Sequence, residues 1–454
     1  MDHLTVVDEI FLRTHRGMGT PIALQGLWRT PDAMEPDLLQ AIHGRLRVGH
    51  LGRRVVSPRV PGARRTWRPN TRAHPLDVAI GPLRESEILP WADALGTDLD
   101  PENGPGWRLS AARLHDGGTV VALTCSHALA DARGLIHAIT AALRSLESTV
   151  SDASTELAGA ELVPARDDEL WSRTTPSEWA DAVSQWTTIF GGTARALHQK
   201  LSRPLVPPAP DLSPDRTFRE AGPDPVSSSA VPTSRKPQSS RADTSDRHLR
   251  PLLLTFDATH WDTTAITLGG TPNSLFIHLM ANILWQTGFP KPTITASLPV
   301  DTRDEPRVDN DLAMTEIAIE RTDTPATIRD RAKAAYQRRM SSPAGLPEEI
   351  LQVLPDRWAY ALSKGAGERD ILCSNIGHLP DAVRKVGPHH CTRVAARAIH
   401  PDITTFPRTQ LAGYLSRLDD TYTLALVSLA ADSDFLPDAI DKACATTGLR
   451  PSPW

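Results

Sequence analysis

The 454-residue sequence predicts a mixed α/β (α+β) fold arranged as two domains. Three observations lead to this prediction. The chain is longer than one ordinary hydrophobic core needs. Each half interleaves strand-like segments with segments of helical apolar spacing. Between the halves, residues 201–250 are rich in Pro, Ser, Asp and Arg, and such a segment cannot bury enough apolar surface to offset its ordering entropy. We therefore expect a first domain at 1–165, a connecting helix at 166–200, a largely disordered linker at 201–250 and a second domain at 251–454.

In the first half, helical spacing and turn signals alternate with strand patterns. They predict helices at 4–12, 32–46, 85–95 and 132–146 and strands at 22–28, 76–80, 107–114 and 119–125. The last two strands flank His115-Asp-Gly-Gly118, which predicts a β-hairpin. Residues 167–199 predict a loosely amphipathic helix whose aromatic side chains pack in a core. These side chains are Trp171, Trp179, Trp186 and Phe190.

The second half has the same mixture of patterns. It predicts strands at 252–256, 293–300, 313–319, 372–377, 411–418 and 422–429 and helices at 273–286, 327–340 and 435–447. The last two strands alternate on either side of Asp419-Asp420, which predicts a second hairpin.

Composition excludes several classes of protein. A net charge of −5 argues against nucleic acid as a partner, and four widely spaced cysteines suggest neither a disulfide framework nor a zinc ribbon. No stretch approaches the roughly 20 apolar residues of a membrane span, and the first residues do not resemble a signal peptide. We expect a cytoplasmic monomer.

Several site types are excluded by their motifs. His389-His390-Cys391 has no nearby carboxylate or second cysteine pair, so we expect a loop there and no metal site. The glycine pairs match neither a phosphate-binding loop nor a dinucleotide fingerprint, and no Gly-x-Ser-x-Gly elbow occurs. We expect no bound cofactor.

The segment around His127 is the best candidate site. The apolar strand pattern of 120–125 ends just before His127, and Asp131 follows four residues later at the start of a helix. A histidine at a strand end can serve as a general base, or it can be a buried histidine whose hydrogen bonds are satisfied. The spacing alone leaves both interpretations open.

A second feature is an arginine-rich stretch. Nine arginines lie between Arg45 and Arg72, and no acidic residue occurs there before Asp77. The stretch is either a solvated surface or a local positive field that attracts phosphates or an acidic protein.

Three motifs together resemble those of the chloramphenicol-acetyltransferase-like superfamily, which includes condensation domains, polyketide-associated acyltransferases and wax ester synthases. Ser126-His-Ala-Leu-Ala-Asp131 resembles the HHxxxDG motif. Pro299-Val-Asp-Thr-Arg303 resembles the "PV…R" segment, and Ser374-Asn-Ile-Gly377 resembles the "SN.G" strand end. The resemblance covers most of the chain except the expected linker.

The resemblance implies two domains of one fold that form a V, with the active site in a tunnel between them. A thioester donor, either acyl-CoA or the phosphopantetheine arm of an acyl or peptidyl carrier protein, would enter from one side. A small-molecule alcohol or amine acceptor would enter from the other. His127 would take the acceptor's proton and return it to the leaving thiolate.

The resemblance also assigns roles to residues around His127. Asp131 would shape the site by pairing with Arg303, in a bidentate geometry. Asn375 and Ser374 would face the substrate from the opposite wall. Ser126 stands where the motif has its first histidine. Ala132 replaces the motif glycine and adds a methyl group near the developing oxyanion, and Gly134 is a further site-shaping residue.

These features lead us to expect a stand-alone acyltransferase or condensation enzyme of natural product biosynthesis. In one alternative, a condensation-like protein without transferase activity binds a carrier protein through the arginine-rich stretch, where Arg64 and Arg65 are candidates for docking the donor. In another, the protein is a wax ester or diacylglycerol synthase, although no amphipathic basic helix for membrane docking is evident.

Overall fold

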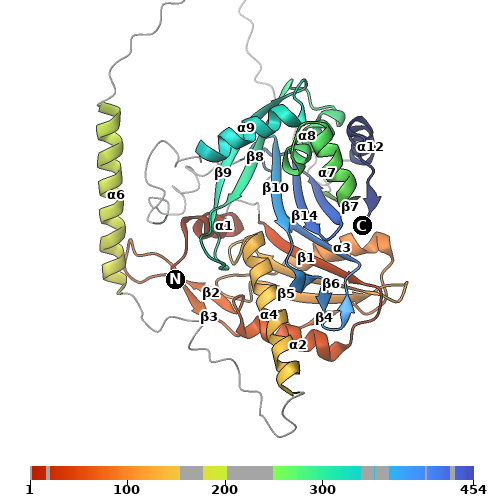
Figure 1. The fold of residues 1–454 in the computed structure, drawn as a ribbon. Coiled ribbons are helices and arrows are strands. Elements are labelled where there is room, and N and C mark those ends of the chain that lie inside the picture. The colour runs from red at the N-terminus through yellow and green to blue at the C-terminus, as the bar shows by residue number, and fades with distance from the viewer. Residues whose placement is uncertain are drawn as a thin grey trace, which may run out of the picture.

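Two β-sheets with helices packed on them form the structure, a computed structural model (Figure 1). It describes residues 3–16, 21–153, 177–201, 249–338, 352, 368–403, 406–429 and 435–454. The first sheet has five strands in the order β13-β1-β6-β5-β4, and the second has seven in the order β16-β7-β15-β14-β10-β8-β9. The predicted mixed α/β class is therefore confirmed.

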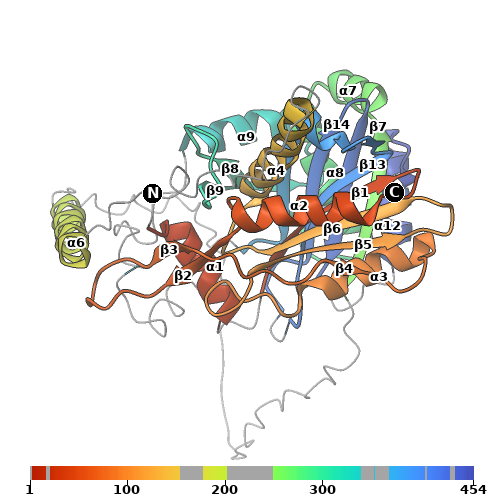
Figure 2. The ribbon, with the colours of Figure 1, turned by 90° about the horizontal axis from the view of Figure 1, so that it is seen from below.

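The first sheet centres on the hairpin that the sequence predicts. Its strands are β1 (Ala23–Thr30), β4 (Asp77–Val78), β5 (Trp107–Arg113), β6 (Thr119–Ser126) and β13 (Arg393–Ile399). Helices α2 (Pro36–Val48) and α4 (Ala132–Ala153) lie on one side of this sheet, and α3 (Ile88–Asp93) lies on the other (Figure 2). The described residues also contain short 3-10 turns at η1 (Glu85–Glu87), η2 (Ala94–Gly96) and η5 (Asp381–Val383).

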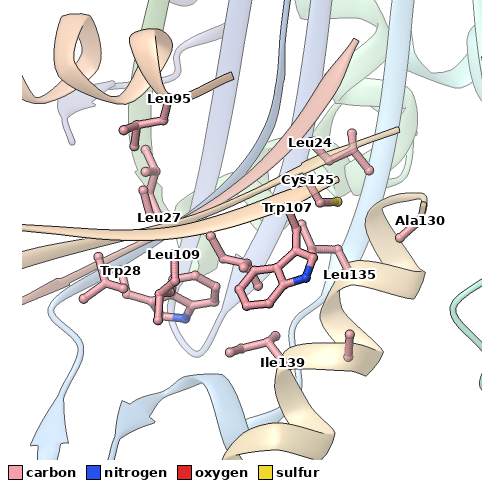
Figure 3. Close-up of a cluster of buried hydrophobic side chains, with 14 of the residues drawn as sticks. Leu24, Leu27, Trp28, Leu95, Trp107, Leu109, Cys125, Ala130, Leu135 and Ile139 are labelled. Atoms are coloured by element: carbon pink, nitrogen blue, oxygen red, sulfur yellow. The ribbon is translucent and has the colours of Figure 1, made fainter. Parts of the chain in front are cut away.

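Large apolar side chains fix these layers. Figure 3 shows Trp107 and Leu109 of β5 on the side of Leu135 and Ile139 of α4. All four residues are buried. Burial of side chains of this size contributes about 1.5–3 kcal/mol each, so the packing holds the start of α4, and the turn before it, against the end of β6.

Strand β13 joins the first sheet although it belongs to the second half of the sequence. It pairs antiparallel with β1, from Ala23 opposite Ile399 to Arg29 opposite Arg393. The sequence did not predict this strand, because its Arg-Val-Ala-Ala-Arg-Ala-Ile pattern lacks clear alternation. A boundary at residue 251 therefore does not separate the two sheets.

The second sheet is built from the second half of the chain. Its strands are β7 (Arg250–Asp257), β8 (Thr293–Asp301), β9 (Leu312–Glu320), β10 (Ile371–His378), β14 (Leu411–Leu418), β15 (Thr421–Ser428) and β16 (Ser452–Pro453). Strands β14 and β15 form the predicted hairpin. The helices packed with this sheet are α7 (Ala258–Thr267), α8 (Pro272–Gln286), α9 (Pro325–Arg338) and α12 (Leu436–Thr447). The almost entirely apolar α8 is buried at the centre of this core, and Thr271 caps its first turn.

Helix α1 (Val6–Arg16) and a small hairpin lie beside the turn that follows β6. In this hairpin, β2 (Arg53–Val56) pairs with β3 (Thr66–Pro69). A small hairpin of β11 (Lys385–Val386) and β12 (His389–His390) occupies a stretch where we expected a loop. Within the described ranges, no helix is long and apolar enough to cross a bilayer.

Helix α6 (Glu178–Leu201) stands apart from both sheets (Figure 1). Its aromatic stripe is exposed, at 70% for Trp179, 41% for Trp186 and 67% for Phe190, so the prediction that these side chains pack in a core is wrong. The buried side of the helix is a different one, which carries Asp181, Ala182, Gln185 and Ile189. Asp181 binds Arg64, and Glu178 accepts the backbone N–H groups of residues 59 and 60. Trp171, and nearly all of the expected linker, lie outside the described residues.

Candidate functional site

His127 lies in the turn that follows β6. Its backbone N–H donates to the carbonyl of Ile22 over 3.0 Å, which ties the turn to the residue just before β1. Its imidazole stacks on Phe11 of α1, with ring centroids 3.5 Å apart and planes 12° apart. The ring is therefore held between the end of the first sheet and the N-terminal helix.

Asn310, which the sequence did not single out, contacts His127 and is itself bound by Asp8 of α1. The Nδ1 atom of His127 lies 3.1 Å from Oδ1 of Asn310. The Asn310 amide nitrogen donates to the His127 carbonyl at 2.9 Å and to Oδ1 of Asp8 at 2.8 Å. Because Asn310 lies 183 residues after His127, no spacing pattern could have indicated the contact.

The surroundings of His127 keep its ring neutral. Burial lowers the pKa of His127, so the imidazole carries no charge at neutral pH. Burial raises the pKa of Asp8 to about 6, against the opposing effect of the Arg53 guanidinium. A neutral imidazole can accept a proton, which a general base must do.

Asp131 links two distant segments. Its Oδ1 accepts the backbone N–H of Gly134 at 2.8 Å and so caps the first turn of α4. Its Oδ2 accepts Nη2 of Arg303 at 2.5 Å and the backbone N–H of Asp311 at 3.2 Å. The expected ion pair between Asp131 and Arg303 is therefore present, but one guanidinium nitrogen makes it. The prediction of a bidentate pair is wrong, because the other carboxylate oxygen accepts the backbone N–H of Gly134.

Arg303 and Arg53 anchor the loop that carries Asn310. Arg303, whose side chain is 6% exposed, also donates to the carbonyl of Asp309 at 2.7 Å. Arg53 binds the Asp309 carboxylate at 2.5 Å and the Leu129 carbonyl at 2.5 Å. The residues on either side of Asn310 are thereby fixed to the His127 turn.

Gly134 is at a point of close approach. A Cβ atom there would lie 2.3 Å from the carbonyl oxygen of Val308, so only glycine lets this loop pack on α4. Ala132, two residues earlier, is partly buried and lines the main cavity.

A cavity of about 1010 Å³ opens beside His127. Its described lining is mainly apolar, with polar groups near His127, Asp131 and Arg303. The apolar part comes from both sheets and from α1 and α4. It includes Val6, Ile10, Leu24, Trp28, Leu135, Ile136, Ile139, Leu372, Ile376, Val394, Ala412 and Tyr414.

Ser374 and Asn375 of β10 line the cavity as well. The Asn375 amide nitrogen donates to Oδ1 of Asn273 at 2.9 Å, and its oxygen accepts the N–H of Gly377 at 3.0 Å. These bonds support the strand end, where Gly377 has a φ of +79° that favours glycine.

A second histidine lines this cavity. His400 follows β13, and burial together with the nearby His127 lowers its pKa to about 4. Nothing in the sequence distinguished it from the other histidines.

The main cavity is not lined by four of the predicted residues, namely Gly134, Ser126, Arg64 and Arg65. Ser126 borders a separate cavity of about 250 Å³ with His15, Gly96 and Asp402. Arg64 binds Asp181 of α6, and Arg65 binds Glu9 of α1, so both guanidinium groups are engaged within the chain.

Among the residues that the structure describes, no group of three or more His, Cys, Asp or Glu side chains is placed to hold a metal ion. The buried His389 ring lies 2.8 Å from Glu35 and 2.9 Å from Asp32, whose side chains are exposed.

No family model matches the sequence, and no curated protein matches it. Solved structures do. The nonribosomal peptide synthetase FmoA3 aligns over 98% of this chain at 17% identity with a TM-score of 0.52, and this chain spans 44% of its length. Polyketide synthase associated protein 5 from Mycobacterium tuberculosis aligns over 98% of both chains at 14% identity, TM-score 0.53. The condensation domain of the Monacolin K polyketide synthase MokA aligns over 98% of this chain and 96% of its own, at 12% identity, TM-score 0.54.

These similarities show the fold. The chain has the two-lobed fold of condensation domains, and the predicted chloramphenicol-acetyltransferase-like fold is confirmed. Identities of 12–17% show the fold alone.

Proposed function

We propose that the protein is an acyltransferase that moves an acyl group from a thioester to an alcohol or amine, with His127 as the general base. The observation that carries the proposal is an imidazole held by Phe11 and Asn310 in the wall of a 1010 Å³ cavity between the two sheets, where burial lowers its pKa. Asp131 and Arg303 support the turn that presents it.

The reaction balances with one base. His127 takes the proton of the hydroxyl or amine as that oxygen or nitrogen bonds to the thioester carbonyl carbon. The carbon–sulfur bond of the resulting intermediate then breaks, and the imidazolium returns the proton to the thiolate. A positioned base of this kind contributes roughly 10²–10⁴-fold to the rate.

The cavity lining supports an apolar substrate. Leucine, isoleucine, valine and alanine side chains dominate the walls away from His127. Burial of apolar substrate surface there would supply binding free energy of roughly 25 cal/mol per Å². We therefore expect a large apolar acyl group or acceptor, with the thioester carbonyl held at the polar end.

The donor would carry a phosphopantetheine arm, on either CoA or a carrier protein. Carrier docking through Arg64 or Arg65 would first have to break their ion pairs with Asp181 and Glu9. Charge reversal at both arginines, compared on CoA and carrier-bound donors, tests this route. A monomeric, cytoplasmic protein stays a prediction.

Intact-mass measurement of a loaded carrier protein, with candidate acceptors, tests the activity. We expect the wild type to release the acyl group to the acceptor, and His127→Gln and His127→Ala to lose at least 10²-fold in rate while remaining folded. His115→Ala, at an exposed site on the β5–β6 hairpin, is the matched control. Equal rates for His127→Gln and wild type would overturn the base assignment. Carrier binding without acyl loss would favour the non-catalytic alternative.

A further inference from the structure

We propose that Asn310 and Asp8 are positioning residues that fix the His127 imidazole with its proton on Nδ1, so that Nε2 faces the substrate as the proton acceptor. Neither residue belongs to the motifs that drew attention to the site. The inference deepens the proposed function and rests on it for its kinetic part only.

The orientation of the Asn310 amide follows from its partners. Its nitrogen contacts Oδ1 of Asp8 at 2.8 Å and the carbonyl of His127 at 2.9 Å. A carbonyl oxygen can only accept, and Oδ1 of Asp8 already accepts the Asn310 backbone N–H at 2.9 Å. The amide nitrogen of Asn310 therefore points toward these two acceptors, and the amide oxygen points toward Nδ1 of His127.

The tautomer of His127 follows from that orientation. Oδ1 of Asn310 carries no hydrogen and lies 3.1 Å from Nδ1 of His127. A hydrogen bond at this position requires the proton on Nδ1. In the neutral ring Nε2 then has the free lone pair, and the base function falls to that atom.

Asp8 holds Asn310 through the start of helix α1. Thr5 donates its N–H to Oδ2 of Asp8 at 2.9 Å, and the Thr5 hydroxyl donates to the Asn310 carbonyl at 2.9 Å. Phe11, three residues after Asp8 on the same helix, stacks on the imidazole. One helix therefore fixes both the amide that selects the tautomer and the plane of the ring.

Nitrogen-15 NMR of the histidine rings in the full chain tests the inference without substrate. We expect His127, assigned by its loss in His127→Gln, to show a protonated Nδ1 and an unprotonated Nε2 at pH 8. In Asn310→Ala the ring should populate both tautomers, and kcat should fall roughly 10- to 100-fold, mainly without a change in KM. Asp8→Asn keeps an oxygen acceptor and should retain the wild-type tautomer, whereas Asp8→Leu should behave like Asn310→Ala.

The control is Asn282→Ala, which removes an amide that donates to the His278 carbonyl in α8, away from the cavity. It should leave the His127 signals unchanged. A wild-type ring with its proton on Nε2, or an unchanged ring in Asn310→Ala, would overturn the inference. Because the NMR readout needs no turnover, an inactive wild type with the expected tautomer would refute the acyl transfer and leave the tautomer assignment intact.

Discussion

At the N-terminal end of α4, the backbone leaves no room for a side chain at residue 134. The Val308 carbonyl lies where a Cβ atom would be, and that carbonyl is backbone in a loop fixed by Arg303 and Arg53. The loop cannot retreat without loosening Asn310. The glycine is therefore required by the site geometry, although glycine generally weakens a helix.

Replacement of Gly134 by alanine should lower the free energy of unfolding by about 1–3 kcal/mol, because the methyl group overpacks the contact with Val308. Urea denaturation measures the change. Gly44→Ala in α2 is the matched control, since nothing lies within 4 Å of its Cβ position. That variant should gain about 0.5–1 kcal/mol. Equal effects at the two sites would contradict the close approach.

His400 makes the stability of the protein depend on pH. Its pKa falls from 6.5 to about 4 on folding. Between these values the unfolded chain binds the proton and the folded chain does not, so stability falls as pH falls through this range.

Between pH 7 and pH 4, the free energy of unfolding should fall by about 3 kcal/mol less in the His400→Gln variant than in the wild type. Urea denaturation at a series of pH values gives the difference, in which the opposing contribution of Asp8 cancels. His115→Gln, at an exposed position, should follow the wild type. Parallel curves for His400→Gln and wild type would show that burial does not affect this histidine.

The sequence indicated the residues of the site that belong to local motifs. His127, Asp131 and Arg303 each lie at a strand end or in a recognisable segment. Asn310, Asp8 and His400 act through contacts between segments far apart in the chain, and nothing in their neighbouring residues marks them. A hydrogen bond over 183 or 302 positions is a product of tertiary packing alone.

At the scale of elements, helix α4 begins at a residue with two tasks. Asp131 caps the helix with one oxygen and neutralises the buried Arg303 with the other. The helix cap requires only a hydrogen-bond acceptor, whereas the buried guanidinium of Arg303 requires a negative charge nearby.

Asp131→Asn and Asp131→Ala separate the two tasks. Both should destabilise the protein, by at most about 3–5 kcal/mol, because the buried Arg303 loses its buried carboxylate partner and keeps only the more exposed Asp301. The alanine variant should lose about 1 kcal/mol more, because it also lacks the cap. Thermal and urea denaturation, with Thr271→Ala at the cap of α8 as a reference for the loss of a cap alone, measure both effects. Equal losses in the two Asp131 variants would mean that the cap contributes nothing.

The sequence predicts helices and strands that have strong apolar periodicity. It does not predict elements that form only through contacts with distant parts of the chain. The β5–β6 and β14–β15 hairpins and α8 follow directly from their patterns. Strand β13 is a strand because β1 offers it an edge, which its own residues do not show. The aromatic side chains of α6 have helical spacing, but this spacing does not show whether another part of the protein packs against them.

At the scale of the whole molecule, the two halves of the sequence do not fold into two separate sheets. Strand β13 returns from the second half to pair with β1 along its length, and Thr423 of β15 donates to the Val394 carbonyl of β13 at 3.0 Å. The first sheet lacks an edge strand until the second half is present.

Expressed as two chains, residues 1–201 and 249–454 should form a stable one-to-one complex only when produced together. The first fragment alone should aggregate, because an unpaired edge of β1 is exposed. Co-purification and light scattering measure the outcome. A monomeric, cooperatively folded first fragment would contradict the dependence on β13.

The contact between His127 and Asn310 also affects the newly made chain. His127 is synthesised 183 residues before the amide that orients it. At 5–20 residues per second, this delay lasts roughly 10 to 40 seconds. During that time His127 lacks the amide that orients its ring, so either nitrogen can carry the proton. The proposed orientation of the ring is reached only when synthesis has passed Asn310 and the loop has docked.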